Sequence, residues 1–235
     1  MTRAARDFIT LAADLPLADA VALYGRVADC VGVVKVGLSL FVEHGPLAVR
    51  AFTREGATVF LDLKLHDIPN TVEWAARRAV DLGIRYLTVH ASGGSAMLEA
   101  ARRGVEGSDV RLLAVTVLTS HDAVSLREVG LTQRPAEAAT ALAALAWKSG
   151  LRGVVCSPRE VRSFKAAHGT SLFACTPGIR PAGSAPDDQA RAETPATAIA
   201  EGSDMVVVGR PIYAAVDPVV AARLILADVE AALTE

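Results

Sequence analysis

Short apolar runs recur about eight times along this chain, and a longer stretch with a helical pattern follows nearly every one. Nearly continuous apolar strands are typical of parallel sheets that are covered on both faces. Eight strand–helix units predict an α/β fold of the (β/α)8 TIM-barrel class, in which an outer helix follows each strand. The strands are predicted at residues 8–13, 32–36, 58–64, 85–90, 111–118, 153–156, 171–175 and 205–208.

An open, doubly wound sheet is the alternative for a chain in which strands and helices alternate. Its dinucleotide-binding form carries G-x-G-x-x-G after the first strand, and this sequence has no such turn there. Because 235 residues is an ordinary length for one barrel, we expect residues 1–235 to form a single domain. The helices are predicted at residues 17–28, 46–55, 68–82, 95–106, 135–149, 158–167 and 195–201, with a last helix after Pro211.

The composition argues against several classes of function. The net charge is −2 and lysines and arginines do not cluster, which argues against a nucleic-acid surface. The longest apolar stretches, such as residues 138–147, are too short to span a bilayer. The three cysteines lack the spacing of metal ligands, and we expect small buried side chains in a reducing compartment. We therefore expect a cytoplasmic protein that binds neither membranes nor nucleic acid.

Polar and charged residues lie at or just after the C-terminal end of nearly every predicted strand. In a barrel these ends meet on one face, where active sites are built. A serine or threonine there means little, because loops are polar in any case. Lys35 and Lys64 are more informative, since each lies within a strand, where a charge needs a partner. The full set is Asp14, Lys35, Asp62, Lys64, Asp67, His90, Ser92, Thr119, Ser120, residues 177–180, Gly209 and Arg210.

The densest cluster of charge is the stretch FLDLKLHDIPNTV at residues 60–72. Alternate side chains of a strand share a face, so Asp62 and Lys64 are predicted to point one way and the intervening leucines the other. Asp67 follows where the chain bends, and Pro69 suits the first turn of a helix. A structural ion pair at a strand end is the simpler interpretation of D-x-K-x-x-D alone. The functional interpretation depends on the motifs elsewhere in the chain.

The ends of the last two strands predict a phosphate site. Gly209 and Arg210 follow the eighth strand at the start of a helix. A glycine lets a backbone N–H approach a phosphate, and an arginine can bind it through two parallel hydrogen bonds. Barrels often bind phosphate after strands seven and eight. The long loop at residues 175–191 carries Arg180 and Gln189, which we expect to close over a ligand; a solvated flexible loop is the alternative.

Together these motifs resemble the orotidine 5′-phosphate decarboxylase family. The short D-x-K-x-x-D pattern also occurs in the related 3-keto-gulonate-6-phosphate decarboxylases. The extension to H-D-I-P-N-T-V, the L-T-S element and the glutamine of D-Q-x-R indicate the orotidylate branch. One small departure is AADLP at residues 12–16, which keeps Asp14. The matching segments follow the family's order through nearly the whole chain: VKVG (34–37), DLKLHDIPNTV (62–72), VTVLTS (115–120), TPGIRP (176–181), DQAR (188–191) and VVGRPI (207–212).

The resemblance implies a barrel that decarboxylates orotidine 5′-monophosphate to uridine 5′-monophosphate without a metal ion or an organic cofactor. It implies that Lys64 is the proton donor, that Asp62 lies near the substrate carboxylate and that Lys35 belongs to the same charge network. It also implies a homodimer with shared active sites, to which Asp67 and Thr71 reach from the partner subunit.

The resemblance further implies the contacts that hold the rest of the substrate. Asp14 and Lys35 would bind the ribose hydroxyl groups. The pyrimidine and the closing loop would be contacted by Thr119, Ser120, Pro177 and Gln189. The 5′-phosphate would be held by Arg180, Gly209 and Arg210.

The residue types suit this chemistry. Loss of CO2 from C6 of orotidylate leaves a carbanion with little resonance stabilisation. A lysine between carboxylates stays protonated and offers that carbanion both a cation and an acid. His66 and His90 are not at the spacing of metal ligands, and we expect no metal site. Two alternatives remain: another phosphosugar decarboxylase of the superfamily, which would use a metal ion, and a non-catalytic phosphate-binding barrel.

Overall fold

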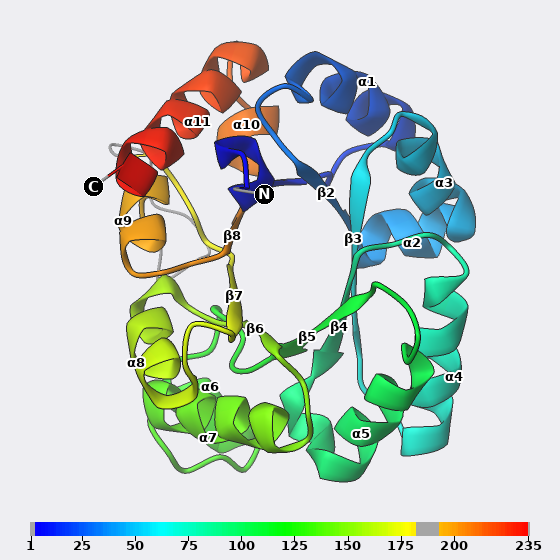
Figure 1. The fold of residues 1–235 in the computed structure, drawn as a ribbon, viewed down its shortest axis with the longest axis vertical. Coiled ribbons are helices and arrows are strands. Elements are labelled where there is room, and N and C mark those ends of the chain that lie inside the picture. Colours follow the sequence, from blue (N-terminus) through cyan, green and yellow to red (C-terminus); the bar gives the residue numbers. More distant parts are fainter. Residues whose placement is uncertain (1–2, 182–192, 235) are drawn as a thin grey trace.

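The computed structural model describes residues 3–181 and 193–234. Its strands form a closed parallel barrel in which each strand pairs with the next in the sequence and the last pairs with the first (Figure 1). This closure confirms the predicted barrel and shows that the open-sheet alternative is wrong. The strands are β1 (Ile9–Ala12), β2 (Val33–Gly37), β3 (Thr58–Leu65), β4 (Tyr86–His90), β5 (Arg111–Val115), β6 (Gly153–Val155), β7 (Phe173–Thr176) and β8 (Met205–Val208).

An outer ring of helices surrounds the barrel (Figure 1). Many of them have proline in their first turn, where its missing N–H would have found no partner within the helix. The helices are α1 (Leu17–Val27), α2 (Leu38–His44), α3 (Pro46–Arg54), α4 (Pro69–Val80), α5 (Gly94–Gly104), α6 (Ala123–Glu128), α7 (Pro135–Lys148), α8 (Pro158–His168), α9 (Pro195–Ala200), α10 (Arg210–Tyr213) and α11 (Pro218–Thr234). None of the helices in the described part of the chain combines the length and apolar character of a membrane span.

The structure adds helices that the sequence pattern did not predict. Helix α2 follows β2 directly and ends at Gly45, whose φ of 54° separates it from α3. Helix α6 begins at Asp122, whose carboxylate accepts the N–H groups of Val124 and Ser125. The predicted C-terminal helix is divided into α10 and α11. Helices α2, α6 and α10 contain too few turns to show a periodic pattern of their own.

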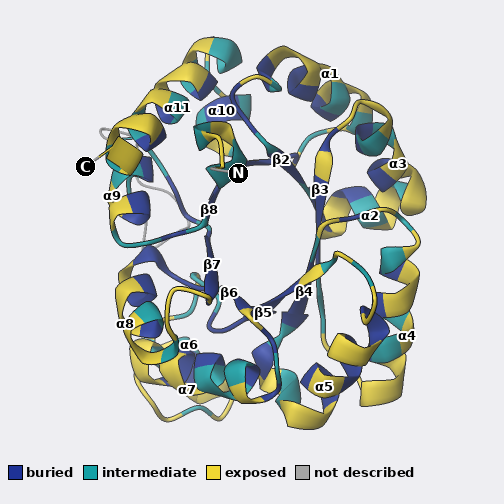
Figure 2. Ribbon diagram, viewed as in Figure 1, coloured by how far each residue is buried: buried dark blue, intermediate teal, exposed yellow. Residues whose placement is uncertain are grey.

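Two apolar cores hold the barrel together. Side chains that point inward fill its interior, and a larger core joins the outer face of the strands to the helices. Figure 2 shows the consequence, because the strands are almost entirely buried whereas each helix exposes its outer face. The interior core consists of Ala12, Val33, Phe60, Leu113, Phe173, Cys175, Met205 and Val207. Because side chains alternate along a strand, the inward-pointing residues that follow this core toward the C-terminal end of a strand face the mouth of the barrel at that end.

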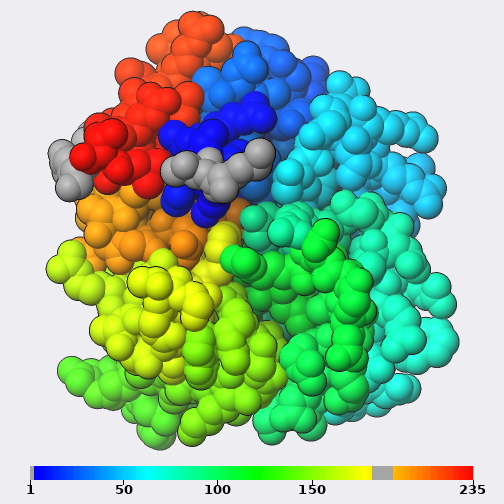
Figure 3. Space-filling model, in the orientation of Figure 1, coloured from blue at the N-terminus to red at the C-terminus, as the bar shows by residue number. Residues whose placement is uncertain are grey.

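The N-terminal end of the barrel is covered by the start of the chain. In the orientation of Figure 3 this segment, in dark blue, lies at the front of the molecule. Its short 3-10 helix η1 (Ala5–Phe8) contacts β1, β8 and α11. The guanidinium of Arg3 lies 4.0 Å from the centre of the Phe8 ring. The covered end leaves the C-terminal ends of the strands as the place for a site.

Strand β3 is irregular near that end. Leu61 pairs with Leu87 of β4, but the next recorded pair is Leu65 with Val89, so β3 uses more residues than its neighbour over the same length. Lys64 lies within this bulge with φ of 50°, and it is the one non-glycine residue with positive φ among those described. The left-handed conformation costs a lysine about 1 kcal/mol, so surrounding contacts must maintain it.

Candidate active site

A cavity of about 280 Å³ lies at the C-terminal ends of the strands. It brings together charged side chains from β2 and β3 with residues that follow β1, β5, β7 and β8. From the residues predicted for the site, those that line it are Asp14, Lys35, Asp62, Lys64, Thr119, Pro177, Arg180, Gly209 and Arg210. These side chains lie far apart in the sequence, and the barrel's parallel topology is what makes them neighbours.

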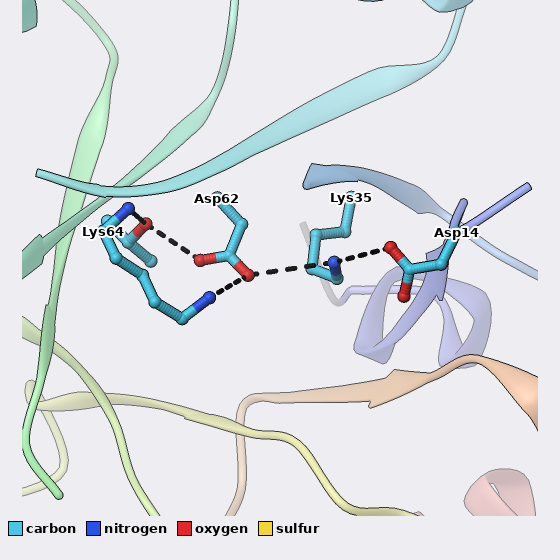
Figure 4. A network of polar contacts seen from close by, with 5 residues as sticks. Asp14, Lys35, Asp62 and Lys64 are labelled. Carbon is cyan, nitrogen blue, oxygen red and sulfur yellow. Dashed lines mark hydrogen bonds and ion pairs between the residues drawn. The ribbon is translucent and has the colours of Figure 1, made fainter. Parts of the chain in front are cut away.

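Alternating acids and bases cross the floor of this cavity (Figure 4). Nζ of Lys35 lies 3.3 Å from Oδ1 of Asp14 and 3.8 Å from Oδ2 of Asp62. The same Asp62 oxygen accepts a hydrogen bond of 2.8 Å from Nζ of Lys64. The Asp62 and Lys35 side chains are only 10% and 12% exposed. Each buried charge therefore has an opposite charge beside it, as burial requires.

Glycine at position 37 makes room for this arrangement. A β-carbon on Gly37 would lie 2.9 Å from Nζ of Lys35 and 3.3 Å from Oδ1 of Asp14. The contact of 2.9 Å is too close for a β-carbon and the one of 3.3 Å is tight, so a larger residue would push the ammonium group aside. The VKVG segment thus supplies both the cation and the space that the cation occupies.

A threonine that the sequence reasoning missed connects the pair on β3. Thr88 of β4 is fully buried, and its Oγ1 accepts the backbone N–H of Lys64 at 2.8 Å. The same hydroxyl donates to Oδ1 of Asp62 at 2.9 Å. The signal in the sequence was alternation along β4, which places Thr88 on the same inward face as Tyr86.

The rest of the cavity wall is mostly apolar. Aliphatic side chains at the ends of β5 and β6, together with Ile179 and Tyr213, complete it; they include Val115, Val117 and Val155. Cys156 and Cys175 also line the wall, and burial raises the pKa of both thiols, so they stay uncharged. An apolar wall opposite a row of charges suits a flat, uncharged ring that carries charged substituents.

Some predicted site residues lie outside the cavity. Asp67 is exposed, and its Oδ1 accepts the backbone N–H of Ile68 at 2.6 Å. It lines a separate, open depression with His66 and neighbouring residues. Thr71 on α4 and Ser120 after β5 are both exposed and do not line the cavity either. A single chain therefore does not bring Asp67 to Lys64. Gln189 lies outside the described residues.

Backbone hydrogen bonds fix the position of Arg180 beside the cavity. Its N–H donates to the carbonyl of Glu193 at 2.9 Å, and the N–H of Glu193 donates to the carbonyl of Gly178 at 3.3 Å. The Glu193 carboxylate accepts a hydrogen bond of 2.7 Å from Nε of Arg159 on α8. Within residues 3–181 and 193–234, no group of three or more His, Cys, Asp or Glu side chains could hold a metal ion.

Comparison with known proteins identifies the family. A model of the Orotidine 5'-phosphate decarboxylase / HUMPS family matches residues 7–225. The chain belongs to this family. It is 55% identical to an orotidine 5'-phosphate decarboxylase of Anaeromyxobacter sp. (strain K), over 95% of this chain and 96% of the relative. It is 51% identical to one of Halorhodospira halophila, over 95% of this chain and 96% of the relative.

A solved structure of the family agrees with this assignment. The crystal structure of orotidine 5'-phosphate decarboxylase from Lactobacillus acidophilus is similar with a TM-score of 0.81 and 40% sequence identity. The match covers 95% of this chain and 99% of that one. The resemblance drawn from the D-L-K-L-H-D-I-P-N-T-V segment and the later motifs is therefore confirmed at the level of the family.

Two histidines, His66 after β3 and His90 at the end of β4, lie side by side. The rings of His66 and His90 have centroids 5.4 Å apart. Burial lowers the pKa of His90 below its ordinary value of 6.5, and the nearby His66 and Lys64 lower it further, against an opposing effect of Asp62. His90 is therefore neutral in the folded protein at pH values where an unfolded chain would already bind a proton.

We expect the lowered pKa of His90 to make the folded protein less stable at acidic pH. As the pH falls below about 6.5, the unfolded state binds a proton at His90 and the folded state does not. The free energy of unfolding therefore decreases until the pH falls below the lowered pKa of the folded state, where both states bind the proton. The free energy of unfolding, measured with urea at several pH values, should decrease less toward acidic pH for His90→Gln than for the original chain. Parallel curves for the two proteins would contradict this assignment.

Proposed function

We propose that this chain catalyses the decarboxylation of orotidine 5′-monophosphate to uridine 5′-monophosphate, the last step of de novo UMP biosynthesis. The family and its relatives named orotidine 5'-phosphate decarboxylase support this activity. The observation that carries it is the pair of Lys64 and Asp62, 2.8 Å apart in a cavity that Arg180 and Arg210 also line. Phosphate-binding cations and a proton donor thus share one space.

The chemical step centres on the ammonium group of Lys64. The bond between C6 and the carboxylate carbon breaks, CO2 leaves, and the electron pair remains on C6. Nζ of Lys64 then gives a proton to C6, and the resulting amine regains a proton from solvent. Before that transfer the positive charge of Lys64 stabilises the developing carbanion. The hydrogen bond from Nζ to Asp62 holds the donor at the cavity floor.

The neighbouring charges support the same step. Asp62 lies where the substrate carboxylate would approach, and departure of CO2 relieves the repulsion between the two. Lys35 lies between Asp62 and Asp14, so it keeps both acids in place while its remaining hydrogens and the Asp14 oxygens meet the ribose hydroxyl groups. Asp14 is the more exposed acid, with 45% of its side chain accessible, which suits contact with a ligand.

The phosphate is bound away from the reacting carbon. Arg180 and Arg210 supply guanidinium groups, and Gly209 lets the backbone approach the phosphate oxygens. Thr119 and Pro177 line the same cavity, and we assign the pyrimidine ring to their part of it. We also assign Ser120 and Gln189 to the pyrimidine side. Binding energy gained at the remote phosphate orders the substrate over Lys64.

The active form is a homodimer with shared sites. Asp67 and Thr71 are exposed and lie outside their own chain's cavity, so each is available to a second subunit. Ile68 and Trp74, on the same segment, are 67% and 61% exposed, and large apolar side chains in such a position favour an interface. The reaction uses neither a metal ion nor an organic cofactor, and we place the enzyme in the cytoplasm, free of membrane and nucleic-acid partners.

A direct assay tests this function. The purified chain should consume orotidine 5′-monophosphate, followed by the loss of its ultraviolet absorbance, at the same rate with and without a metal chelator. Because the ammonium group of Lys64 stabilises the carbanion, removing metal ions should leave the rate unchanged. Turnover of a different sugar phosphate that stops with the chelator would indicate another branch of the superfamily. Binding of orotidylate without any spectral change would indicate a non-catalytic barrel.

A further inference from the structure

The proton donor occupies an unfavourable backbone conformation that one side chain stabilises. Lys64 has φ of 50°, and β3 carries its bulge at this residue. Ladder hydrogen bonds are interrupted there, so the Lys64 N–H needs another acceptor. Oγ1 of Thr88 supplies it at 2.8 Å. The threonine belongs to β4, and β4 thus determines where β3 directs its lysine.

The same hydroxyl also orients Asp62. A threonine hydroxyl has one hydrogen to donate, and here it points to Oδ1 of Asp62 at 2.9 Å. This bond leaves Oδ2 of Asp62 to face Nζ of Lys64 at 2.8 Å and Nζ of Lys35 at 3.8 Å. Thr88 is fully buried, so water cannot replace it at either bond.

We propose that Thr88 is a positioning residue: its buried hydroxyl fixes the Lys64 backbone and the Asp62 carboxylate together, and so sets the proton donor over C6. The inference rests on the proposed decarboxylation and adds to it a residue that does not line the cavity. The main effect of removing the hydroxyl falls on kcat rather than on KM, because the phosphate is bound at the other side of the site.

The chain offers a matched control for this hydroxyl. Thr10 of β1 is also fully buried, but its Oγ1 has no hydrogen-bond partner among residues 3–181 and 193–234. Thr10→Val and Thr88→Val make the same change of shape in buried strands of one barrel. Only the second change breaks bonds to the charged pair. Thr88→Ser keeps the hydroxyl and removes the methyl group instead.

Steady-state kinetics of the three variants test the proposal. Thr88→Val should lose about 10- to 100-fold in kcat with little change in KM, since a small misplacement of the donor is enough for such a loss. Thr88→Ser should recover most of the rate, and Thr10→Val should match the original chain. Circular dichroism establishes that each variant is folded. Unchanged kcat for Thr88→Val, or equal losses for Thr10→Val, would overturn the proposal.

Crystal structures of the original chain and Thr88→Val give a test that does not depend on turnover. In the variant, Lys64 should leave the left-handed region or its Nζ should move out of hydrogen-bond range of Asp62. Retention of both features would show that the barrel holds the lysine without Thr88. If the original chain fails to decarboxylate orotidylate, the proposed activity is wrong, while these structures still decide the positioning role.

Discussion

Lys64→Ala should reduce decarboxylation by roughly 10⁴-fold or to below detection, because it removes the proton and the positive charge that the carbanion needs. The barrel itself should survive, since the Lys64 side chain is 30% exposed and its backbone bond to Thr88 does not depend on the side chain. The loss of orotidylate absorbance gives the rate. Circular dichroism and the melting temperature report the fold.

Two further variants separate chemistry from general damage. Lys64→Gln keeps much of the side-chain length without the ammonium group and should be as inactive as the alanine variant. Lys165→Ala removes a different, partly buried lysine, whose Nζ lies 2.9 Å from Asp204 outside the cavity, and should retain activity in the folded protein. Near-normal turnover by Lys64→Ala would refute the assignment of the proton donor.

Mixing two inactive variants should restore activity if the sites are shared between subunits. Homodimers of Lys64→Ala and of Asp67→Ala should both be poor enzymes. In a mixed dimer, one site combines the intact Lys64 of one chain with the intact Asp67 of the other. Random reassembly makes half of the dimers mixed, with one of two sites intact, so activity should return to about one quarter of the original.

A double variant provides the control for this experiment. Lys64→Ala mixed with the Lys64→Ala, Asp67→Ala chain cannot form an intact site and should stay inactive. Two affinity tags, one on each chain, establish that mixed dimers are present. Mixed dimers without recovered activity would argue that Asp67 does not cross to the partner's cavity.

The sequence predicts much of the barrel because its strongest signals are local. Apolar runs mark the strands, and lysines within two of them mark the face on which charges converge. Lys35 and Lys64 could be recognised because a charge in a strand needs a partner, and the structure supplies Asp62 to both. The short helices α2 and α6 could not be predicted, because they carry no strong local signal of this kind.

The contacts of Lys64 with its neighbours could not be predicted in the same way. Its positive φ depends on how many residues of β3 lie opposite β4, and this register cannot be read from the residue types. Thr88 looks like an ordinary strand threonine until its partners are known. Asp67 lies in the expected segment, yet the chain's own fold leaves it outside the cavity, so the role proposed for it requires a second subunit.

The alternating row across the cavity floor has a consequence for how such a protein can diverge. The formal charges of Asp14, Lys35, Asp62 and Lys64 sum to zero, so this row is balanced within itself and the guanidinium groups of Arg180 and Arg210 add the cavity's net positive charge. Losing Lys35 alone would leave Asp14 and Asp62 without the cation between them, and losing Lys64 alone would leave the row with a net charge of −1. Losing Asp62 alone would leave the two lysines without the anion between them. Tolerated changes at these positions should therefore occur as compensating pairs, one acid with one base, rather than singly.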